Sequence, residues 1–408
     1  MPVSRFHSYL NSAKKILSVY KGEDPFASFL KKYFAQNKKF GSKDRKQIAH
    51  LCYCYFRSAP PSASGGGIKE AHINMQEKIL TGLFLCSFEP NEMLEAIKQE
   101  WNEIVQLSLA EKFSFINYQL SSVFPWKEEL SEGIEHEKFC ESFFQQPDLF
   151  LRLRPGKEEL VKQKLQKARI DFKIISDSCL ALDNTIKIDT IIELNKEAVV
   201  QDYNSQQIGR FLGFALATPR NDKPAVWDCC AGSGGKSIML FDINSGIELT
   251  VSDIRKTILI NLKKRFERAG IKNYNSLVID LGEKNIQHSI INNPRLPDGQ
   301  EQSIIIADVP CTGSGTWGRT PEQLFYFNNQ TIGQFSNLQK KIISNITPHL
   351  QTGGYLLYIT CSVFKKENEE VVEYIREKFN LELQAMEILK GYDKKADTMF
   401  AALLKKAL

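Results

Sequence analysis

Residues 226–237 of this chain read VWDCCAGSGGKS. This sequence indicates an apolar strand that ends in Asp228, followed by a glycine-rich turn that opens a helix. Glycines allow a sharp turn and a close approach of the backbone to a ligand, and a helix N-terminus presents free N–H groups. We therefore predict a ligand-binding turn between a strand and a helix.

Two familiar nucleotide-binding motifs do not fit this turn. A P-loop needs a glycine five positions before the Gly-Lys pair, where this chain has Cys230. The dinucleotide fingerprint G-x-G-x-x-G needs a glycine three positions after Gly234, where this chain has Ser237. A turn without any ligand remains the alternative, and the residues that follow it bear on the choice.

Strands and helices alternate from Asp202 to the end of the chain. This alternation predicts an α/β, Rossmann-like fold with a parallel sheet and helices on both faces. A ligand of such a sheet binds at the carboxyl ends of its strands. The predicted strands are Ala225–Asp228, Ile247–Asp253, Asn275–Ile279, Ser303–Asp308 and Tyr355–Thr360, with helices such as Arg255–Ala269 and Gln334–Leu350 between them.

An acid stands at the end of each of the next three strands. Asp253 ends the second strand, where a carboxylate can accept both hydroxyls of a ribose. Asp280 follows the third, in position for an adenine amino group, and Asp308 ends the fourth. One such Asp is common as a helix cap, but three along one sheet edge suit a nucleoside that carries a sulfonium and an ammonium group.

Two cysteines follow adjacent strands at the same edge. Cys311 lies in the D-V-P-C turn and Cys361 in the T-C-S turn. A lone cysteine at a strand end is usually a small buried residue, but a pair suits methyl transfer to C5 of cytosine. C5 is a poor nucleophile until a thiolate adds to C6, and a base must then remove the C5 proton. Methyl transfer to nitrogen needs neither thiol.

These motifs together resemble the Sun/Fmu (NOL/NOP/Sun, RsmB-like) family of S-adenosylmethionine-dependent RNA cytosine-C5 methyltransferases. The resemblance covers most of residues 150–408. More faintly, the N-terminal helices, which end in Tyr55-Phe56-Arg57, resemble a NusB-like RNA-binding domain. Besides the motifs above, the resemblance rests on Val200-Gln201-Asp202 with Ser205-Gln206, Arg319 with Pro321-Glu322, Gln339, Gly353-Gly354 and Glu367-Asn368-Glu369.

The resemblance also implies a role for each candidate residue. Cys361 would attack C6, and Cys311 would help to release the methylated base. Lys236 and Asp308 would orient that base as well. The cofactor, S-adenosylmethionine, would contact Cys230, Ala231, Gly232, Ser233, Gly234, Gly235, Lys236, Asp253, Asp280 and Asp308.

Two segments depart from the family pattern. The family loop C-A-A-P-G-G-K has Gly232-Ser233 here in place of Ala-Pro, and we expect altered loop stiffness rather than lost binding. Near the end, D-G-F-F-x-A is replaced by a segment that carries Thr398-Met399. In relatives this segment lies near the active site, so the change bears on substrate fit.

The chain before residue 201 holds two further regions. Apolar residues recur at helical spacing from about Tyr9 to Arg57, with a helix start at Asp24-Pro25, and again from about Asn74 to Phe113. The stretch SAPPSASGGG, residues 58–67, predicts a flexible loop between them. The predicted domains are 1–125, helical, NusB-like and RNA-binding; 126–200, a linker helix and a small βαββ unit that positions RNA; and 201–408, the catalytic domain.

Basic residues gather in the first of these regions. Residues 1–60 hold twelve Lys and Arg against three acids, so with a net charge of +5 the remainder is slightly acidic. Such an excess is typical of either a solvated helical face or a phosphate-binding surface, and charge alone leaves both open. Arg152 and Arg154 on the first strand of the small unit are further candidates to face RNA.

We therefore expect an RNA cytosine-C5 methyltransferase that acts on ribosomal RNA, with transfer RNA as the second choice. A non-catalytic RNA-binding assembly factor of the ribosome is the alternative from another class, and the presence of both cysteines and all three acids disfavours it. No apolar run reaches the ~18–20 residues that span a bilayer, and the nine cysteines form no C-x-x-C pair. We expect a cytoplasmic monomer with no membrane contact and no metal.

Overall fold

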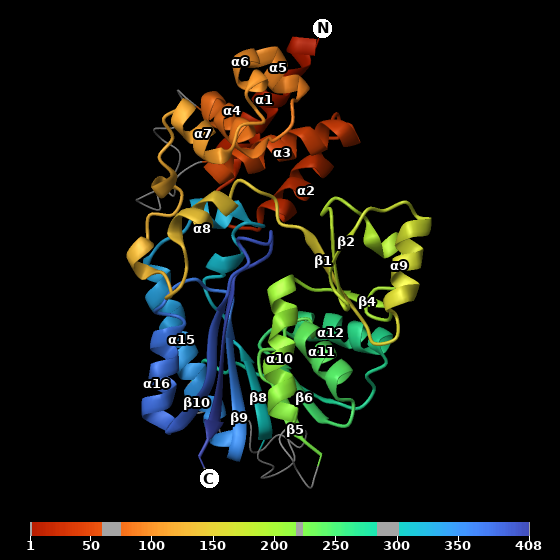
Figure 1. Ribbon diagram of the computed structural model, residues 1–408, viewed down its shortest axis with the longest axis vertical. Helices are drawn as coiled ribbons and strands as arrows, with labels where there is room; N and C mark the ends of the chain where they lie inside the picture. Colours follow the sequence, from red (N-terminus) through yellow and green to blue (C-terminus); the bar gives the residue numbers. More distant parts are fainter. Residues whose placement is uncertain (1, 59–74, 218–222, 284–301, 408) are drawn as a thin grey trace. The chain divides into compact units, whose positions relative to one another are not determined.

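The computed structural model describes residues 2–58, 75–217, 223–283 and 302–407 (Figure 1). The chain folds into two compact units. Most of the predicted loop 58–67 lies outside the described residues, and the predicted functional division at 125 and 200 stays a prediction. Unit 1 consists of Met1–Glu128, Glu135–Gln146 and Thr316–Thr331, and unit 2 of Glu129–Ile134, Pro147–Gly315 and Ile332–Leu408.

Unit 1 is helical because its apolar residues recur at helical spacing and because polar residues cap its short helices. Asn91 caps α5 through Leu94 N, and Ser108 with Glu111 forms a capping box at α7. The helices are α1 (Pro2–Val19), α2 (Phe26–Gln36), α3 (Ser42–Ser58), α4 (Met75–Cys86), α5 (Glu92–Ile97), α6 (Gln99–Glu103), α7 (Leu109–Phe115), α8 (His136–Ser142) and α14 (Pro321–Phe325), with 3-10 turns η1 (Leu120–Ser122), η2 (Lys127–Glu129) and η4 (Ser314–Thr316) at or near its borders.

The helix predicted at Asp24-Pro25 begins one residue later than expected. Pro25 is the cap residue of α2 and makes no side-chain capping bond. Asp24 binds Lys32 Nζ at 2.6 Å instead, and the free N–H of Phe26 donates to Glu322 at 3.2 Å. A carboxylate from a distant part of the sequence thus stabilises the first turn of α2 in place of the local Asp.

This distant carboxylate belongs to Thr316–Thr331, which packs with the N-terminal helices although the sequence places it inside the predicted catalytic domain. Arg57 at the end of α3 donates to the carbonyl of Gly318 at 2.7 Å. Rings from α14 and the residue after it meet rings of α3 and of the α1–α2 turn, and all are buried or half-buried. The ring contacts join Phe56 to Phe325, Phe56 to Tyr326, Tyr55 to Phe325, and Tyr20 to Tyr326.

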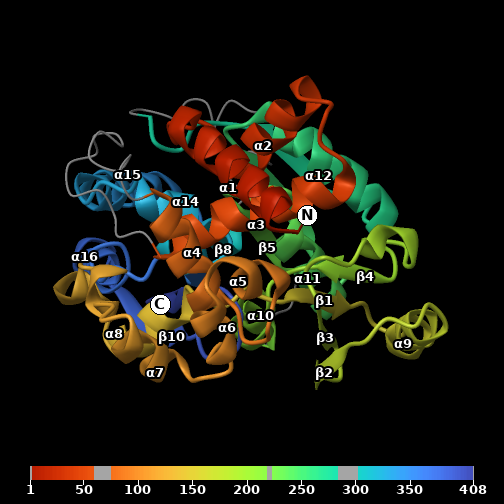
Figure 2. The ribbon, with the colours of Figure 1, turned by 90° about the horizontal axis from the view of Figure 1, so that it is seen from above.

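The first part of unit 2 is a small four-stranded antiparallel sheet in the order β2-β3-β1-β4. Helix α9 (Glu158–Lys167) covers it through Val161 and Leu165. The predicted βαββ pattern is present, and a fourth strand that we did not predict completes the sheet. The strands are β1 (Leu149–Leu153), β2 (Lys173–Ser176), β3 (Cys179–Leu182) and β4 (Ala198–Val200), with η3 (Ile188–Thr190) before the last. Figure 2 shows this sheet and α9 together at one side of unit 2.

The prediction that Arg152 and Arg154 face RNA is wrong. Arg152 is buried, with its Nη1 at 2.6 Å from Asp242, and Arg154 Nη2 lies 2.6 Å from the other oxygen of the same carboxylate. A buried carboxylate needs such partners because an unpaired charge is costly inside a protein. Asp242 lies on α11 (Gly235–Ile243), so the two arginines join the small sheet to the helix that follows the glycine-rich turn.

The second part of unit 2 is a seven-stranded sheet in the order β10-β11-β9-β8-β5-β6-β7. Its five central and edge strands from β9 to β7 are parallel, as predicted. At the other edge β11 pairs antiparallel with β9 and β10 pairs antiparallel with β11, and we did not predict these two strands. The strands are β5 (Ala225–Asp228), β6 (Glu248–Asp253), β7 (Asn275–Val278), β8 (Gln302–Asp308), β9 (Leu350–Thr360), β10 (Leu381–Leu389) and β11 (Met399–Lys406).

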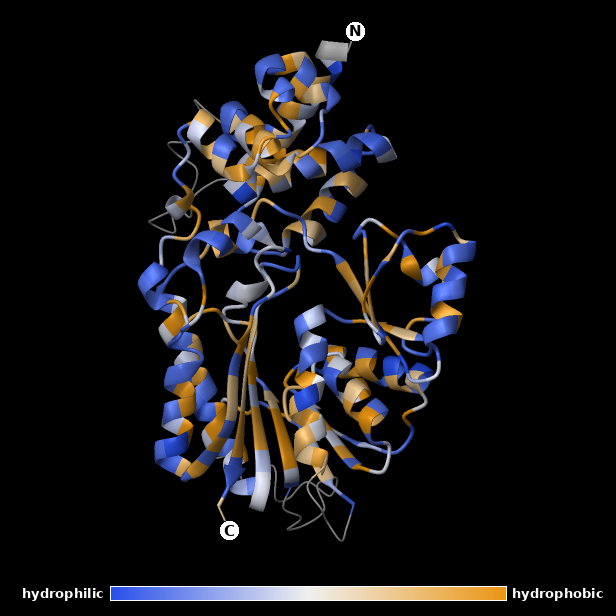
Figure 3. Ribbon diagram, in the orientation of Figure 1, coloured by the Kyte–Doolittle hydropathy of each residue, from blue (hydrophilic) through white to orange (hydrophobic). Residues whose placement is uncertain are grey.

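Helices cover both faces of this sheet. One core cluster joins α10 (Tyr203–Ala217), α11 and α12 (Lys256–Ala269) to one face, and the other joins α15 (Gln330–Ile346) and α16 (Glu369–Phe379) to the opposite face. Hydrophobic residues run along the strands between these layers (Figure 3). Among the described helices, none combines the length and the apolar content that crossing a bilayer requires.

Candidate active site

The predicted residues gather where the parallel strands end. Asp228, Asp253 and Asp308 are the last residues of β5, β6 and β8, and Cys361 follows the last residue of β9. Because β6, β5, β8 and β9 are neighbours in this order, their carboxyl ends form one continuous edge. Asp280 lies two residues beyond β7 and accepts a local bond from Gly282 N at 2.8 Å.

The glycine-rich turn joins β5 to α11 and has the backbone conformation that only glycine adopts easily. Gly232 and Gly234 have φ of +52° and +81°. A side chain at Gly234 would meet Phe266 at 2.6 Å, whereas the space beside Gly232 is open. The N–H of Gly232 donates to Asp253 Oδ2 at 3.0 Å. The turn therefore leaves an open position directly beside the acid predicted to hold a ribose.

Ser233, one of the two departures from the family loop, has its own partner. Arg265 on α12 donates to the Ser233 hydroxyl at 2.6 Å and to its carbonyl at 2.9 Å, and also to Asn195 at 2.9 Å. A guanidinium that binds two atoms of one residue restrains that residue. The loop thus gains from α12 a restraint that a proline ring would have supplied locally, and nothing in its sequence predicted Arg265.

Asp253 is almost fully buried, and all its acceptor positions are filled by the protein. Its Oδ1 accepts the N–H and Nε of Arg255 at 2.9 and 3.0 Å, and its Oδ2 accepts Gly232 N at 3.0 Å and Arg255 Nη2 at 3.1 Å. Burial raises the pKa of Asp253, but the bonds from Arg255 and Gly232 outweigh it and lower the pKa overall. The carboxylate is therefore ionised and ready to accept hydroxyl groups.

The same geometry can be compared with what a ribose requires. A carboxylate has about four acceptor positions, so two ribose hydroxyls need two of them to be vacated. The guanidinium of Arg255 is the donor that can leave, because that side chain is 62% exposed. The open space beside Gly232 and an ionised, buried acid fit the ribose of S-adenosylmethionine once Arg255 has moved away.

Asp228 lies beneath the turn and is fully buried. Its Oδ2 accepts the Ser237 hydroxyl at 2.5 Å, while Oδ1 has no partner among the described residues. Burial raises the pKa of Asp228 to about 7, although the bond from Ser237 opposes it. This carboxyl group is thus a pH-sensitive element under the turn, and it supports the site from below rather than facing a ligand.

Lys236 connects the turn to the cysteine side of the edge. Its Nζ lies 2.5 Å from Asp308 Oδ2. Burial alone would lower the pKa of Lys236, but Asp308 and the Cys361 thiol outweigh it and raise the pKa. Lys236 is therefore an ammonium ion within electrostatic reach of Cys361. The sequence did not show which residue supplies positive charge to that thiol, and Lys236 is a candidate for that role.

The two cysteines lie side by side. The Cys311 thiol donates to Cys361 Sγ at 3.8 Å, and both side chains are half-buried. This bond, together with burial and the nearby charge of Glu367, raises the pKa of Cys311 well above its ordinary value. Cys311 therefore keeps its proton at neutral pH, and Cys361 is the sulfur atom that accepts the bond.

Glu367 holds both cysteine turns, a role that sequence reasoning did not assign to it. Its fully buried carboxylate accepts the Thr312 hydroxyl at 2.6 Å, the Ser362 hydroxyl at 2.7 Å, Thr312 N at 2.9 Å and Gln339 Nε2 at 3.0 Å. Burial raises the pKa of Glu367, and these bonds oppose the shift. Its place in the Glu367-Asn368-Glu369 motif was the only signal in the sequence.

Backbone contacts fix the same turns from behind. Gly315 N donates to the Cys361 carbonyl at 2.8 Å, and Thr398 N donates to the Gly315 carbonyl at 2.9 Å. A side chain at Gly315 would collide with the Thr398 carbonyl at 2.0 Å. Thr398, the second departure from the family pattern, is thus buried behind the Cys361 turn. Among the described residues, no group of three His, Cys, Asp or Glu side chains is placed to share a metal ion.

Comparison with known proteins gives matches over the second half of the chain and beyond. The family model described as 16S rRNA methyltransferase RsmB/F matches residues 214–404. The ribosomal RNA small subunit methyltransferase B of Shewanella oneidensis is 26% identical over 261 residues, which are 62% of this chain and 55% of that protein. The probable ribosomal RNA small subunit methyltransferase B of Bacillus subtilis is 26% identical over 243 residues, 58% of this chain and 51% of that protein.

The chain therefore spans about half the length of these two relatives. Among solved structures, a methyltransferase homologue from Pyrococcus horikoshii aligns with a TM-score of 0.55 and 20% identity, covering 74% of this chain and all of that chain. At this identity the likeness shows the fold. It agrees with the seven-stranded α/β unit described above.

Proposed function

Because residues 214–404 match the model of the 16S rRNA methyltransferase RsmB/F family, we propose that this chain methylates C5 of a cytidine in small-subunit ribosomal RNA. The methyl donor of the proposed reaction is S-adenosylmethionine. The observation that carries the proposal is the pair of thiols 3.8 Å apart beside the Lys236–Asp308 ion pair. Neither thiol would be needed for methyl transfer to nitrogen. The proposal takes the chain to act as a monomer in the cytoplasm.

Cys361 is the nucleophile of the proposed reaction. Its thiolate adds to C6 of the cytosine, forming an S–C6 bond while the electron pair of the C5–C6 double bond moves toward C5. A nearby cation favours the thiolate, and we assign this role to Lys236. To Asp308, which holds Lys236, we assign a hydrogen bond accepted from an amino group of the target base.

Glu367 fixes the distance between the nucleophile and its partner thiol through Ser362 and Thr312. When bound, S-adenosylmethionine supplies an electrophilic methyl group to C5. The glycine-rich turn and Asp253 hold the nucleoside part of the donor. An unstacked cytidine is the expected form of the substrate, because an enzyme that acts on a base takes it out of the stack.

Cys311 acts after methyl transfer. Once Cys361 is bonded to C6 it is no longer an anion, and it no longer accepts a hydrogen bond from the Cys311 thiol. The main cause of the raised pKa of Cys311 is then removed. Cys311 then gives its thiol proton to water, and the resulting thiolate removes the proton from C5. The electron pair of that C–H bond restores the C5–C6 double bond, the S–C6 bond breaks, and Cys361 leaves as a thiolate.

Covalent trapping tests this proposal directly. Purified full-length protein is incubated with small-subunit ribosomal RNA and S-adenosylmethionine, and protein–RNA adducts are separated on a denaturing gel. We expect Cys311→Ala to accumulate an adduct and Cys361→Ala to form none, while both lose 5-methylcytosine formation. Cys86→Ala, which changes a half-buried thiol in unit 1, serves as the matched control and keeps full activity.

Two results would contradict the proposal. An adduct with Cys361→Ala but not with Cys311→Ala would reverse the two roles. Unchanged 5-methylcytosine in ribosomal RNA from cells that lack the protein, measured by bisulfite sequencing, would remove the proposed substrate. Loss of the modification from transfer RNA alone would replace it.

A further inference from the structure

Unit 1 contains an open groove of about 610 Å³ that the catalytic chemistry does not use. One wall comes from α1 and the other from the end of α2 and the turn after it. The lining residues are Ser4, His7, Ser8, Asn11, Ser12, Lys15, Tyr33, Asn37, Lys39 and Phe40. None of them is acidic, so the groove offers only neutral and basic groups to a ligand.

The α1 wall is a continuous polar stripe. Its six residues are spaced three or four positions apart, or adjacent, from Ser4 to Lys15, which places them on one face of the helix. The opposite face of α1, from Phe6 to Leu17, is buried in the core of unit 1. The polar face of α1 therefore lines the groove, to which it presents hydroxyl, amide, imidazole and ammonium groups.

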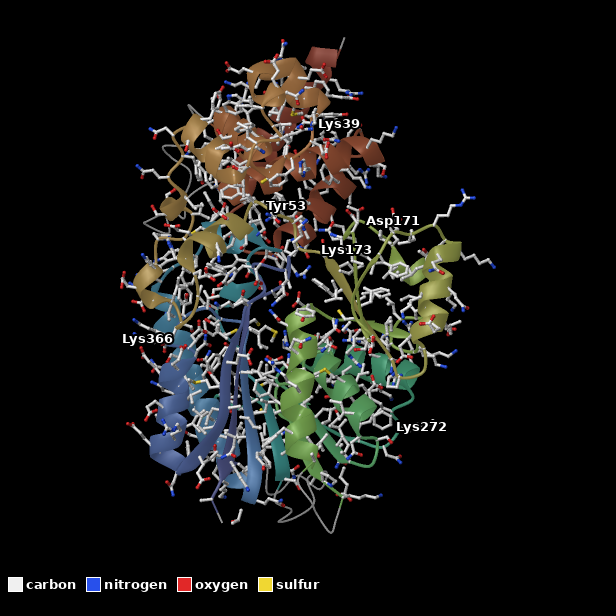
Figure 4. All side chains as sticks on the ribbon, viewed as in Figure 1. Lys39, Tyr53, Asp171, Lys173, Lys272 and Lys366 are labelled. Atoms are coloured by element: carbon white, nitrogen blue, oxygen red, sulfur yellow. The ribbon has the colours of Figure 1, made fainter. Side chains whose placement is uncertain are left out.

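The other wall supplies rings and a second cation. Tyr33 and Phe40 are half-buried, so part of each ring faces the groove. Lys39 is exposed, and its Nζ lies 5.1 Å from the centre of the Phe40 ring. Figure 4 places Lys39 at the surface of unit 1. Asn37 is held in the wall by a bond from its Nδ2 to the Tyr33 carbonyl at 2.8 Å.

The cations of the groove are available to a ligand. Among the residues that the structure describes, neither Lys15 nor Lys39 has a carboxylate within ion-pair distance, unlike Lys32, which binds Asp24. They stand in a region with nine more basic than acidic residues between positions 1 and 60. The free positive charge of this region therefore includes the groove.

We propose that this groove binds a single-stranded stretch of RNA. Cations that track phosphates, combined with aromatic rings on which bases stack, are the features by which proteins bind single strands. Lys15 and Lys39 contact phosphates, Tyr33 and Phe40 contact base faces, and the α1 hydroxyl and amide groups contact the ribose. The inference rests on the proposed function in that the RNA is taken to be the one that is methylated.

The test uses the full chain and a fluorescent ten-nucleotide single-stranded RNA, with binding measured by anisotropy at several salt concentrations. We expect the Lys15→Gln/Lys39→Gln variant to raise the Kd about tenfold. Its salt slope should fall by about 1.4, since each phosphate contact on a single strand contributes about 0.7. The control is Lys43→Gln/Lys46→Gln, which removes two exposed cations of α3 outside the groove.

A second variant tests the rings separately from the charge. Tyr33→Leu keeps the bulk of the side chain and should weaken binding of the RNA about fivefold or more, because stacking on one base contributes roughly 1–3 kcal/mol. It should leave binding of an abasic strand of equal length unchanged. The thermal unfolding midpoint of each variant shows whether unit 1 remains folded.

Three outcomes would contradict the proposal that the groove binds RNA. The control pair could weaken RNA binding as much as the groove pair, a polyglutamate peptide could compete as well as RNA, or Tyr33→Leu could affect both strands equally. Methylation separates this inference from the proposed function. If Lys15→Gln/Lys39→Gln loses RNA binding and the wild-type protein methylates no RNA, the proposed function is wrong and the proposed RNA-binding groove is supported. If Lys15→Gln/Lys39→Gln binds RNA and methylates it with an unchanged KM, the proposed RNA-binding groove is wrong and the proposed function is supported.

Discussion

Two carboxylates of unit 2, one at each end of the site, each accept four hydrogen bonds, but from different kinds of donor. The donors to Glu367 come from side chains and backbone that are buried or half-buried around the cysteines. Two of the donors to Asp253 belong to the guanidinium of one exposed arginine, Arg255. The cysteine end is therefore fixed before any ligand arrives, whereas the nucleoside end exchanges a protein donor for a ligand.

The difference follows from the two tasks. A nucleophile and its partner thiol must be placed to within a fraction of an ångström of productive positions, so their support is internal and permanent. A binding site that releases its ligand after each turnover needs hydrogen-bond partners in the free state as well, and a long solvated side chain supplies them at little cost. Two predictions test this contrast and a third tests the buried acid beneath the turn, starting with the largest effect.

Glu367→Gln should lower kcat about 100-fold, because an amide cannot accept at both positions and at least two donors at the cysteine turns lose their partner. The Kd of the methyl donor should change less than twofold. Steady-state kinetics with ribosomal RNA measures the first and calorimetry the second. Equal losses in kcat and donor binding would show that the two ends are not independent.

Glu369→Gln is the control for that variant. Glu369 is also a partly buried acid, two residues further on, and it accepts from Ser131 at 2.9 Å and from Glu132 N at 3.2 Å. It touches neither cysteine turn. We expect a lower thermal midpoint and an unchanged kcat.

Arg255→Ala should tighten binding of S-adenosylhomocysteine about fivefold, because the ribose no longer competes with the guanidinium for Asp253. Arg255→Lys, which keeps the charge but not the two-pronged contact, should fall between the variant and the wild type. Calorimetry at one pH gives all three values. Weaker binding by Arg255→Ala would mean that the arginine contacts the ligand rather than giving way to it.

Asp228→Asn should change the pH dependence of stability by a few degrees in the thermal midpoint. The folded pKa of Asp228, about 7, is raised by burial above an ordinary value near 3.8. The contribution of this group is therefore fully present below pH 3.8 and is lost as the pH rises to about 7. Asp228→Asn should flatten the midpoint over that window, whereas Asp171→Asn, an exposed acid (Figure 4), should not.

The parallel part of the sheet was predictable because its strands are apolar and each ends in a recognisable turn. Strand β10 was missed because the apolar–polar alternation of its start, LELQ, is broken by the exposed residues Ala385, Met386 and Glu387. Strand β11 follows a short connection without a helix, and alternation of strands and helices cannot predict it. Strand β11 pairs with β9 and β10 pairs with β11, and such pairing is a tertiary effect.

The site was predictable as far as each residue stands next to a strand end. Cys361, Cys311 and the acids follow this rule. The roles of Arg265, Arg255 and Glu367 do not follow it. Arg265 binds a residue 32 positions away, Arg255 one 2 positions away, and Glu367 binds residues 55 and 5 positions away. Only the folded chain selects these partners. The opposite error was made for Arg152. We predicted that this charged residue on a short strand is exposed, but it is buried and paired with Asp242.

The segment Thr316–Thr331 belongs to the helical unit although it lies within the second half of the sequence. It begins one residue after the turn that carries Cys311, and the rings of Phe325 and Tyr326 lie against Phe56 of the N-terminal helices. A shortened chain that starts at Pro147 would keep these rings and lose their partners Tyr20, Tyr55 and Phe56. Such a chain would expose an apolar patch and aggregate. The helical unit therefore cannot be deleted or exchanged as an independent cassette, although it comes first in the sequence.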